Sequence, residues 1–167
     1  MTKEEARGYA LSARKKIIYD QAIIIEKIRP YLKNKKIVGI YYPLSYELDL
    51  RSLEGIFSSI KFVYPAIDGN MISFKENNGI WTKGLFHTIE PNGSAISKDE
   101  IDLIITPLLA INKDNYRIGY GKGYYDRYLS DYHGNTLGII KKELLLDFKE
   151  DEYDIKIKDV IFLWQQL

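Results

Sequence analysis

The sequence contains no cysteine and only two histidines, His87 and His133. Without cysteine the chain can form no disulfide, no thiolate metal site and no cysteine nucleophile. Two histidines argue against a multi-histidine metal centre, so any bound metal should be a hard cation held by carboxylates. The lack of cysteine also fits a reducing compartment.

An excess of charge of one sign is missing as well, because 24 Lys and Arg residues face 23 Asp and Glu residues, a formal net charge of +1. Broad nucleic-acid binding usually requires a basic field. No apolar run approaches the roughly 20 residues of a membrane-spanning helix. The first residues, MTKEEARGYALSARKKI, lack the apolar core of a secretory signal, and Glu4 and Glu5 are untypical of a transit peptide. We therefore expect a cytoplasmic protein that binds neither nucleic acid nor membrane, and we predict no protein partner.

The length of 167 residues suits one domain, spanning 1–167. We find no internal repeat and no linker rich in proline, glycine or serine. Residues 68–99 are rich in turn-forming residues and indicate a hairpin insertion rather than a domain boundary. Tyrosine is abundant, with 14 residues, and supplies both rings for stacking and hydroxyls for hydrogen bonds.

Hydrophobic periodicity predicts helices and strands in alternation. Helices are predicted at 3–32, at 48–59 with Asp49 as N-cap, and at 123–132, and strands at 36–42, 61–67, 102–107, 136–140 and 155–163. This alternation predicts a single-domain α/β protein, a three-layer α/β/α arrangement with a mainly parallel sheet. Ligands of such sheets bind beyond the carboxyl ends of the strands.

One stretch carries a chemical signal, DLIITPLLAINKDNYRIGYGKGYYDRYL at 102–129. An apolar strand is followed by a loop in which Gly119, Gly121 and Gly123 alternate with other residues, and then by an amphipathic helix. Alternating glycines allow the backbone to approach an anion and turn successive N–H groups toward it. The N-terminus of the following helix adds partial positive charge, so the pattern indicates phosphate binding.

Charged residues in the same stretch support this interpretation. Lys122 and Arg117 can neutralise phosphate, and Asp126 is placed to reach a divalent cation that bridges phosphates. The pattern is not a Walker A motif, and its third glycine comes one place early for a dinucleotide fingerprint. The alternative is a tight strand-to-helix turn with Tyr124 and Tyr125 packed in the core.

This stretch resembles the signature of the 5-formyltetrahydrofolate cyclo-ligase family, also called methenyltetrahydrofolate synthetases. The family pattern is a strand ending in proline, a short loop, and R-[LI]-G-x-G-x-G-[YF]-Y-D followed by a helix; every defined position is met from Arg117 to Asp126. The resemblance implies ATP as co-substrate, Mg²⁺ as cofactor and a reduced folate as substrate.

The resemblance also implies an ATP site. Lys3 and Arg7 match a K-x-x-x-R pair that contacts nucleotide phosphates, although the same pair alone reads as a solvated helix face. The implied ATP-binding residues are Lys3, Arg7, Arg117, Gly119, Gly121, Lys122, Gly123, Tyr124 and Tyr125. Of these, Lys122, Tyr124 and Arg117 are the implied catalytic residues.

A folate site is implied by two further segments. In YYPLSYELDLRSL, Glu47 matches an acid that recognises the pterin ring and Tyr42 a residue of the same pocket. The alternative for Glu47 is a capping acid before the helix at Asp49. In LFHTIEP, Phe86 and Glu90 match the family pattern. The implied substrate-binding residues are Tyr42, Glu47, Phe86, Glu90, Tyr120 and Tyr124.

The segment EDEYDIKIKDVIF resembles the C-terminal H-D-x-x-[VL]-D-x-[VI] pattern of the family, with Tyr153 in place of histidine. Asp154 and Asp159 match its acids. The resemblance implies that Asp126 and Asp154 hold the metal and that Asp159 is structural.

The implied reaction converts 5-formyltetrahydrofolate to 5,10-methenyltetrahydrofolate with release of ADP and phosphate. The formyl oxygen attacks the γ-phosphorus, nitrogen 10 attacks the activated carbon, and loss of phosphate closes the ring. No covalent enzyme intermediate is needed, which agrees with the missing cysteine. Two alternatives remain at this point: a sugar-phosphate isomerase-like enzyme with a related sheet, and a non-catalytic nucleotide- or folate-binding module.

Overall fold

The computed structural model describes residues 1–164, so the last three residues of the predicted domain, 165–167, lie outside the described residues. The main sheet contains β1 (Ile37–Gly39), β2 (Lys61–Asp68), β3 (Met71–Glu76), β6 (Ala95–Ile96), β7 (Leu103–Ile105), β10 (Asn135–Lys141) and β11 (Asp159–Leu163). Two small ladders pair β4 (Trp81–Lys83) with β5 (Ile89–Pro91), and β8 (Ala110–Ile111) with β9 (Arg117–Ile118). The helices are α1 (Lys3–Ala13), α2 (Gln21–Leu32), α3 (Leu53–Ile56) and α4 (Tyr124–Leu129).

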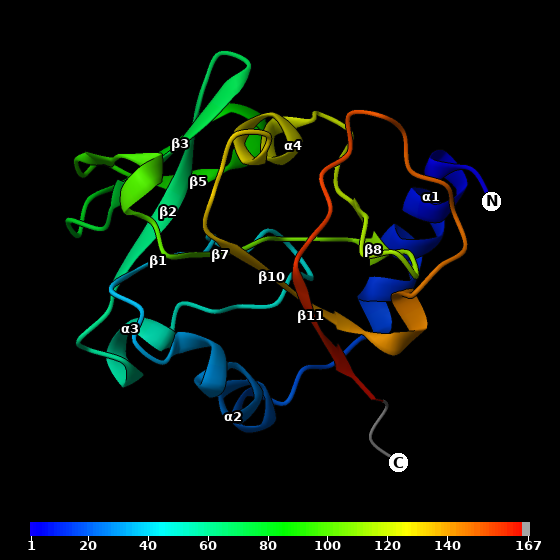
Figure 1. Cartoon of the computed structure of the whole chain (residues 1–167), viewed down its shortest axis with the longest axis horizontal. Coiled ribbons are helices and arrows are strands. Elements are labelled where there is room, and N and C mark those ends of the chain that lie inside the picture. Colours follow the sequence, from blue (N-terminus) through cyan, green and yellow to red (C-terminus); the bar gives the residue numbers. More distant parts are fainter. Residues whose placement is uncertain (165–167) are drawn as a thin grey trace.

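The main sheet is mainly parallel, as predicted. Its strand order is β11-β10-β7-β1-β2-β3-β6 (Figure 1). The strands from β11 to β2 are paired in parallel, and β3 and β6 are antiparallel additions at one edge. The α/β class is therefore confirmed, and the predicted hairpin is formed by β2 and β3, with Gly69 at φ +62° in the turn.

The predicted continuous helix over 3–32 is wrong, because the chain breaks it near the middle. A 3-10 turn (Arg14–Lys16) follows α1, and Ile17 has an extended backbone. Asp20 then caps α2, since its side chain accepts the Ile23 N–H at 3.2 Å. This break allows α1 and α2 to cover opposite faces of the sheet.

The helix predicted over 48–59 is also wrong in extent, since α3 has only four residues and begins after Ser52. Asp49 is not its N-cap. The Asp49 carboxylate instead binds the Arg51 guanidinium, with contacts of 2.9 and 2.7 Å. The helix α4 and the strands β1, β7 and β11 are likewise shorter than predicted.

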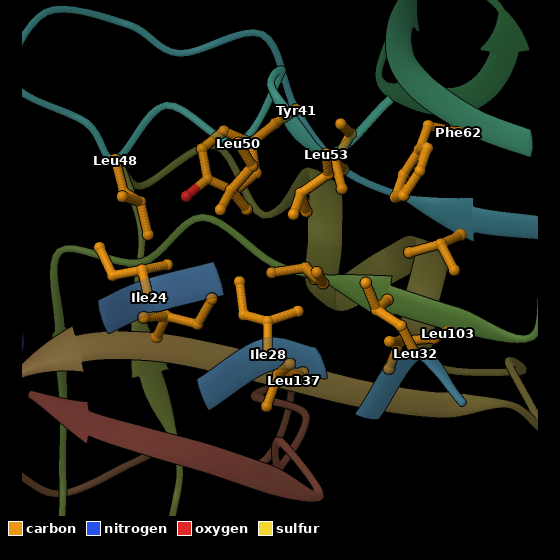
Figure 2. Close-up of a cluster of buried hydrophobic side chains, with 14 of the residues drawn as sticks. Ile24, Ile28, Leu32, Tyr41, Leu48, Leu50, Leu53, Phe62, Leu103 and Leu137 are labelled. Atoms are coloured by element: carbon orange, nitrogen blue, oxygen red, sulfur yellow. The ribbon is translucent and has the colours of Figure 1, made fainter. Parts of the chain in front are cut away.

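Side-chain alternation along the strands explains the three layers. Leu103 and Ile105 of β7 pack with α2 on one face, whereas Ile104 packs with α4 on the other. Figure 2 shows Ile24 and Ile28 of α2 in the first of these clusters. On the second face, Ala6 and Ala10 of α1 are fully buried against β8 and β9. Within the described residues, no helix has both the length and the apolar character to cross a membrane.

Candidate active site

A cleft of about 850 Å³ opens at the carboxyl ends of the parallel strands. Its lining includes Tyr41 and Tyr42 after β1, Pro65 in β2, and Pro107 after β7. The strand β1 has β2 on one side and β7 on the other, so the strand order reverses beside it. Crevices at such reversal points are where open parallel sheets bind ligands.

Every residue predicted for the site lines this one cleft. They are Lys3, Arg7, Tyr42, Glu47, Phe86, Glu90, Arg117, Gly119, Tyr120, Gly121, Lys122, Gly123, Tyr124, Tyr125, Asp126 and Asp154. Two regions of the cleft differ in chemistry. We call the segment 117–126 together with Arg7 the glycine-loop end, and Tyr42, Glu47, Phe86 and Glu90 the carboxylate end.

The glycine loop requires glycine at more than one position. Gly121 has φ +93° and Gly123 has φ +72°, which are backbone conformations that L side chains rarely adopt. A Cβ atom at Gly119 would lie 2.7 Å from Arg117 Nη1. The loop therefore brings its backbone close to a guanidinium and ends at Gly123, the N-cap of α4.

Arg117 is only 7% exposed and lies behind this loop. Its Nη1 donates to the Pro107 carbonyl at 3.2 Å, and its guanidinium lies 5.1 Å from the Tyr125 ring centroid. Burial lowers the pKa of Arg117, and the charge of Asp126 opposes that effect. A guanidinium remains protonated in proteins, so Arg117 supplies a fixed positive charge.

Three further cations surround the loop and also contact neutral groups. Arg7 Nε donates to the Gly119 carbonyl at 2.9 Å, and Lys122 Nζ lies 4.6 Å from the Phe86 ring centroid. Arg127 donates to the Asn70 carbonyl at 2.6 and 2.9 Å. Among the ion pairs of the described residues, none involves these three side chains or Arg117. The glycine-loop end therefore carries a net positive charge, since Arg7, Arg117 and Lys122 outnumber the carboxylate of Asp126, and this charge suits an anionic ligand.

Lys3 differs from these cations because it is paired. Its Nζ lies 2.8 Å from the Asp154 carboxylate and 3.0 Å from that of Asp151. Burial acts to lower the pKa of Lys3, but the two carboxylates outweigh it and raise the pKa. The same pairing lowers the pKa of Asp151.

Two carboxylates near the loop meet the donor requirements of a phosphate-bound Mg²⁺. Asp126 Oδ1 accepts the Ile155 N–H at 3.1 Å, next to Asp154 in the chain. Residues 1–164 contain no cluster of three or more metal-binding side chains. Mg²⁺ at nucleotide sites takes one or two carboxylates and completes its shell with phosphates and water, so this pair fits such a cation.

Glu47 is held in a closed turn at the carboxylate end. Its carboxylate accepts the Leu44 N–H at 2.6 Å, and its own N–H donates to the Leu44 carbonyl at 3.0 Å. Burial raises the pKa of Glu47, although the Leu44 N–H, the charge of Arg14 and the Tyr120 hydroxyl oppose the shift. The alternative of a helix-capping acid is wrong, because α3 begins only after Ser52.

Phe86 and Glu90 lie on the hairpin side of the cleft. Glu90 Oε2 accepts the Ile67 N–H at 2.8 Å and the Thr88 hydroxyl at 3.1 Å, which ties β5 to β2. Phe86 is 54% exposed and has φ +56°, an unusual conformation for an aromatic residue. Its ring is 6.4 Å from that of Tyr124. Phe86 is thus a partly free ring above the cleft.

Tyr42 is held between two other side chains. Its ring centroid is 5.3 Å from that of Trp81 and 4.4 Å from the Arg51 guanidinium. Trp81 also packs edge-on against the buried Tyr64, with ring centroids 4.9 Å apart. Tyr42 therefore forms a rigid wall of the carboxylate end.

Tyr124 and Tyr125 both line the cleft and also pack against the protein. Burial raises the pKa of Tyr125, whose ring lies edge-on to Phe74 at 6.4 Å. The Tyr124 hydroxyl donates to the Gly69 carbonyl at 3.3 Å. These contacts fix the first turn of α4 against the β2–β3 hairpin.

The sequence interpretation missed several residues near the predicted set. Arg127 and Asp151 line the cleft, and Arg14 contacts Tyr120 through a hydrogen bond. Arg127 follows the signature by one residue and Asp151 lies three residues before Asp154, so proximity in sequence was a usable signal. Arg14 offered one signal, its place seven residues after Arg7 on the same predicted helix.

The fold and the cleft define an α/β protein that combines a cationic glycine loop with a partly buried carboxylate and aromatic rings. A family model for the 5-formyltetrahydrofolate cyclo-ligase family matches residues 65–161. The chain belongs to the 5-formyltetrahydrofolate cyclo-ligase family, and it is a ligase of folate metabolism.

Individual relatives agree with this assignment. The chain is similar to the 5-formyltetrahydrofolate cyclo-ligase of Mycoplasma pneumoniae, with 32% identity over 160 residues, 91% of this chain and 89% of that protein. It is also similar to the mouse (Mus musculus) protein of that name, with 35% identity over 75 residues, 41% of this chain and 37% of the mouse protein.

Two solved structures share the fold. A 5,10-methenyltetrahydrofolate synthetase from Mycoplasma pneumoniae has a TM-score of 0.77 at 26% identity, covering 96% of this chain and 98% of the other. The NMR structure of the Aquifex aeolicus 5,10-methenyltetrahydrofolate synthetase has a TM-score of 0.78 at 28% identity, covering 97% and 90%.

Proposed function

We propose that the chain converts 5-formyltetrahydrofolate to 5,10-methenyltetrahydrofolate in a reaction that consumes ATP and requires Mg²⁺. The observation that carries this proposal is the division of one cleft into two ends. Cations with only neutral protein contacts surround the glycine loop, and a partly buried carboxylate occupies the other end. One end complements a triphosphate, and the other complements a ring edge that bears N–H groups.

The glycine-loop end binds the nucleotide phosphates. Backbone N–H groups of the loop and the N-terminus of α4 point toward the anion, and Arg7, Arg117 and Lys122 neutralise it. Phosphoryl transfer depends mainly on such positioning and charge neutralisation. Arg7 and Arg117 donate hydrogen bonds to backbone carbonyls, whereas the Lys122 ammonium contacts the Phe86 ring, so Lys122 is the group that we assign to the transferring phosphate.

The carboxylate end binds the pterin. An ionised Glu47 accepts N–H bonds from the amino-pyrimidine edge, and the rings of Tyr42 and Phe86 cover its faces. Glu90 already holds the Ile67 N–H and the Thr88 hydroxyl, so its role is to shape the pocket. Tyr120 and Tyr124 belong to the glycine-loop end, with Tyr124 beside Phe86, and contact the folate where it meets the phosphate.

The chemistry follows from bringing these ends together. The formyl oxygen attacks the γ-phosphorus and ADP leaves; nitrogen 10 of the same folate then attacks the activated carbon, loses its proton and displaces phosphate. Because both reacting atoms belong to one bound folate, ring closure is intramolecular. Asp126 and Asp154 would hold Mg²⁺, which when bound supplies charge neutralisation between phosphate oxygens.

The test is the absorbance band of the methenyl product, recorded with purified protein and 5-formyltetrahydrofolate, with and without Mg²⁺ and ATP. We expect the band only when both are present. An adenosine triphosphate analogue with a non-transferable γ-phosphate should bind without giving product. A folded protein that binds ATP and folate but gives no product would support a binding module instead.

The variant Asp126→Asn separates the proposal from a metal-independent isomerase. The cyclo-ligase should lose turnover while its thermal unfolding is retained, because the side-chain oxygen that accepts the Ile155 N–H remains. Unchanged turnover would contradict the role of Asp126 in holding the metal.

A further inference from the structure

Arg14 lies outside the lining of the cleft and contacts a loop from each of its two ends. It follows α1 in the 3-10 turn Arg14–Lys16, and its Nη1 donates to the Tyr120 hydroxyl. Its guanidinium carbon lies 5.4 Å from the Tyr120 ring centroid and 5.9 Å from that of Tyr46. Tyr120 belongs to the glycine loop, whereas Tyr46 immediately precedes Glu47. One side chain therefore contacts both loops that build the cleft.

The backbone around Tyr46 is strained in the same place. Tyr46 has φ +67°, a left-handed conformation that is costly for an aromatic residue. This conformation closes the turn in which Leu44 and Glu47 exchange hydrogen bonds. The Arg14 guanidinium against the Tyr46 ring is a contact that holds the strained turn in place.

The contacts of Arg14 are directed at these two loops. Its Nη1 donates to the Tyr120 hydroxyl, and its guanidinium lies over the rings of both Tyr120 and Tyr46. These contacts fix Tyr120 and Tyr46 relative to each other.

Glu47 lies at the centre of these groups. Burial and the carboxylate of Glu47 raise the pKa of Tyr120, and they act in the same direction on the pKa values of Tyr19, Tyr41 and Tyr125. Arg14 contributes the positive charge that opposes the effect of burial on the Glu47 pKa. The four tyrosines are neutral at physiological pH, so they do not replace that charge.

We propose that Arg14 is a positioning residue that joins the glycine loop to the folate-binding turn, orienting Glu47 through Tyr120 and Tyr46. This inference rests on the proposed function, because it assigns Glu47 to the pterin. It predicts that Arg14 acts on folate binding more than on nucleotide binding, since Arg7, Arg117 and Lys122 remain at the phosphates.

The variant Arg14→Gln should weaken 5-formyltetrahydrofolate binding by about tenfold, the scale of one hydrogen bond to a charged group. Burial raises the pKa of Glu47 and the charge of Arg14 lowers it. Without the guanidinium the pKa should rise further, so Glu47 should become protonated at a higher pH. The acidic limb of the pH profile, in which folate affinity falls as Glu47 becomes protonated, should therefore move to higher pH. Arg14→Lys keeps a positive charge and should restore most of that limb, but only part of the affinity.

The experiment is isothermal titration of wild type, Arg14→Gln, Arg14→Lys and Tyr120→Phe with 5-formyltetrahydrofolate across a pH series, and with an ATP analogue at one pH. Lys16→Gln, an exposed cation in the same turn, is the matched control and should change nothing. The double variant Arg14→Gln/Tyr120→Phe should lose less than the sum of the two single losses, because the two side chains act as one unit.

If Arg14→Gln binds folate as tightly as wild type and the acidic limb of its pH profile does not move, the inference is overturned and the proposed function is left intact. Equal weakening of folate and nucleotide binding, with no movement of the limb, would also overturn it in favour of a purely structural role. A wild-type protein that binds no folate would overturn the proposed function and this inference together. Should Arg14→Gln fail to fold, Arg14→Lys and Tyr120→Phe decide by the same criteria.

Discussion

The two ends of the cleft differ in charge: cations surround the glycine loop, and a carboxylate lies at the other end. At the glycine-loop end, Arg7, Arg117 and Lys122 contact carbonyls and a ring, so their charge is left for a ligand. At the carboxylate end, Glu47 is partly buried and accepts a hydrogen bond from a backbone N–H. The difference indicates that each end lacks what its ligand brings: negative charge at one, and N–H donors at the other.

The ends also differ in how they are built. The glycine-loop end comes almost entirely from the contiguous segment 117–126, with Arg7 added from α1. The carboxylate end is assembled from the turn after β1, the hairpin region that contains Phe86 and Glu90, and the contact from Arg14. Substitutions should therefore act locally at the first end and through several elements at the second.

The largest effect is expected from Lys122→Met, which removes a charge and keeps the length of the side chain. Turnover should fall roughly 10²- to 10³-fold, the scale of losing one group that stabilises charge in a transition state. Folate affinity should fall much less than turnover, and the small loss should come from the contact between the Lys122 ammonium and the Phe86 ring. The control is Lys33→Met, which removes an exposed cation at the end of α2. Equal losses of turnover in the two variants would contradict a specific role for the charge at the glycine-loop end.

A smaller and pH-dependent effect is expected from Glu47→Gln. Burial raises the pKa of Glu47 above the ordinary 4.5, so wild-type folate affinity should fall as the pH drops through a midpoint above that value. The ionised acceptor is present above the midpoint and is lost below it. The amide should weaken folate binding about tenfold at neutral pH and abolish this limb. Titrations with an ATP analogue, which should be unaffected, serve as the internal reference.

The backbone of the glycine loop is tested by Gly121→Ala. A side chain at φ +93° introduces about 1–3 kcal/mol of strain, so the loop should shift and the KM for ATP should rise about tenfold. Turnover at saturating ATP should change less than the KM does. An unchanged KM would show that the loop conformation is not needed for nucleotide binding.

The smallest effect belongs to the matched glycine, Gly8→Ala. Gly8 lies in α1, and a Cβ atom there would meet nothing within 4 Å. Alanine in a helix interior is favoured over glycine by about 0.8–1.0 kcal/mol, so thermal unfolding should move to higher temperature with activity retained. Loss of activity in this variant would indicate that α1 must flex during the reaction.

The glycine-loop end was the part of the site most open to prediction, because its glycines, lysine and acid lie within ten residues of sequence. The parallel sheet was equally predictable from the alternation of apolar strands and helices. Both features depend on local chemistry. Few residues other than glycine adopt a left-handed backbone conformation, and a strand that is buried on both faces must be apolar.

The break after α1 and the place of Arg14 were not predictable in this way. Apolar residues recur at helical spacing on both sides of the break, through Ile17 to Ile24 and Ile28, and only Asp20, the N-cap of α2, marks the start of a second helix. Arg14 acquires its role from Tyr46 and Tyr120, which are distant from it in sequence. Aspartate is a common N-cap residue, which is why the sequence predicts a cap at Asp49. In the structure its carboxylate instead binds the guanidinium of Arg51, two residues away. Such competition between local partners is decided by packing.

The most direct test of the central claim follows an oxygen atom. If the formyl oxygen attacks the γ-phosphorus where the two ends of the cleft meet, folate labelled with ¹⁸O in its formyl group must transfer the label to phosphate. Mass spectrometry of the released phosphate should then show one ¹⁸O atom for each methenyl product formed in a single turnover. Product formation with unlabelled phosphate would contradict direct contact between folate and ATP, and with it the division of the cleft described above.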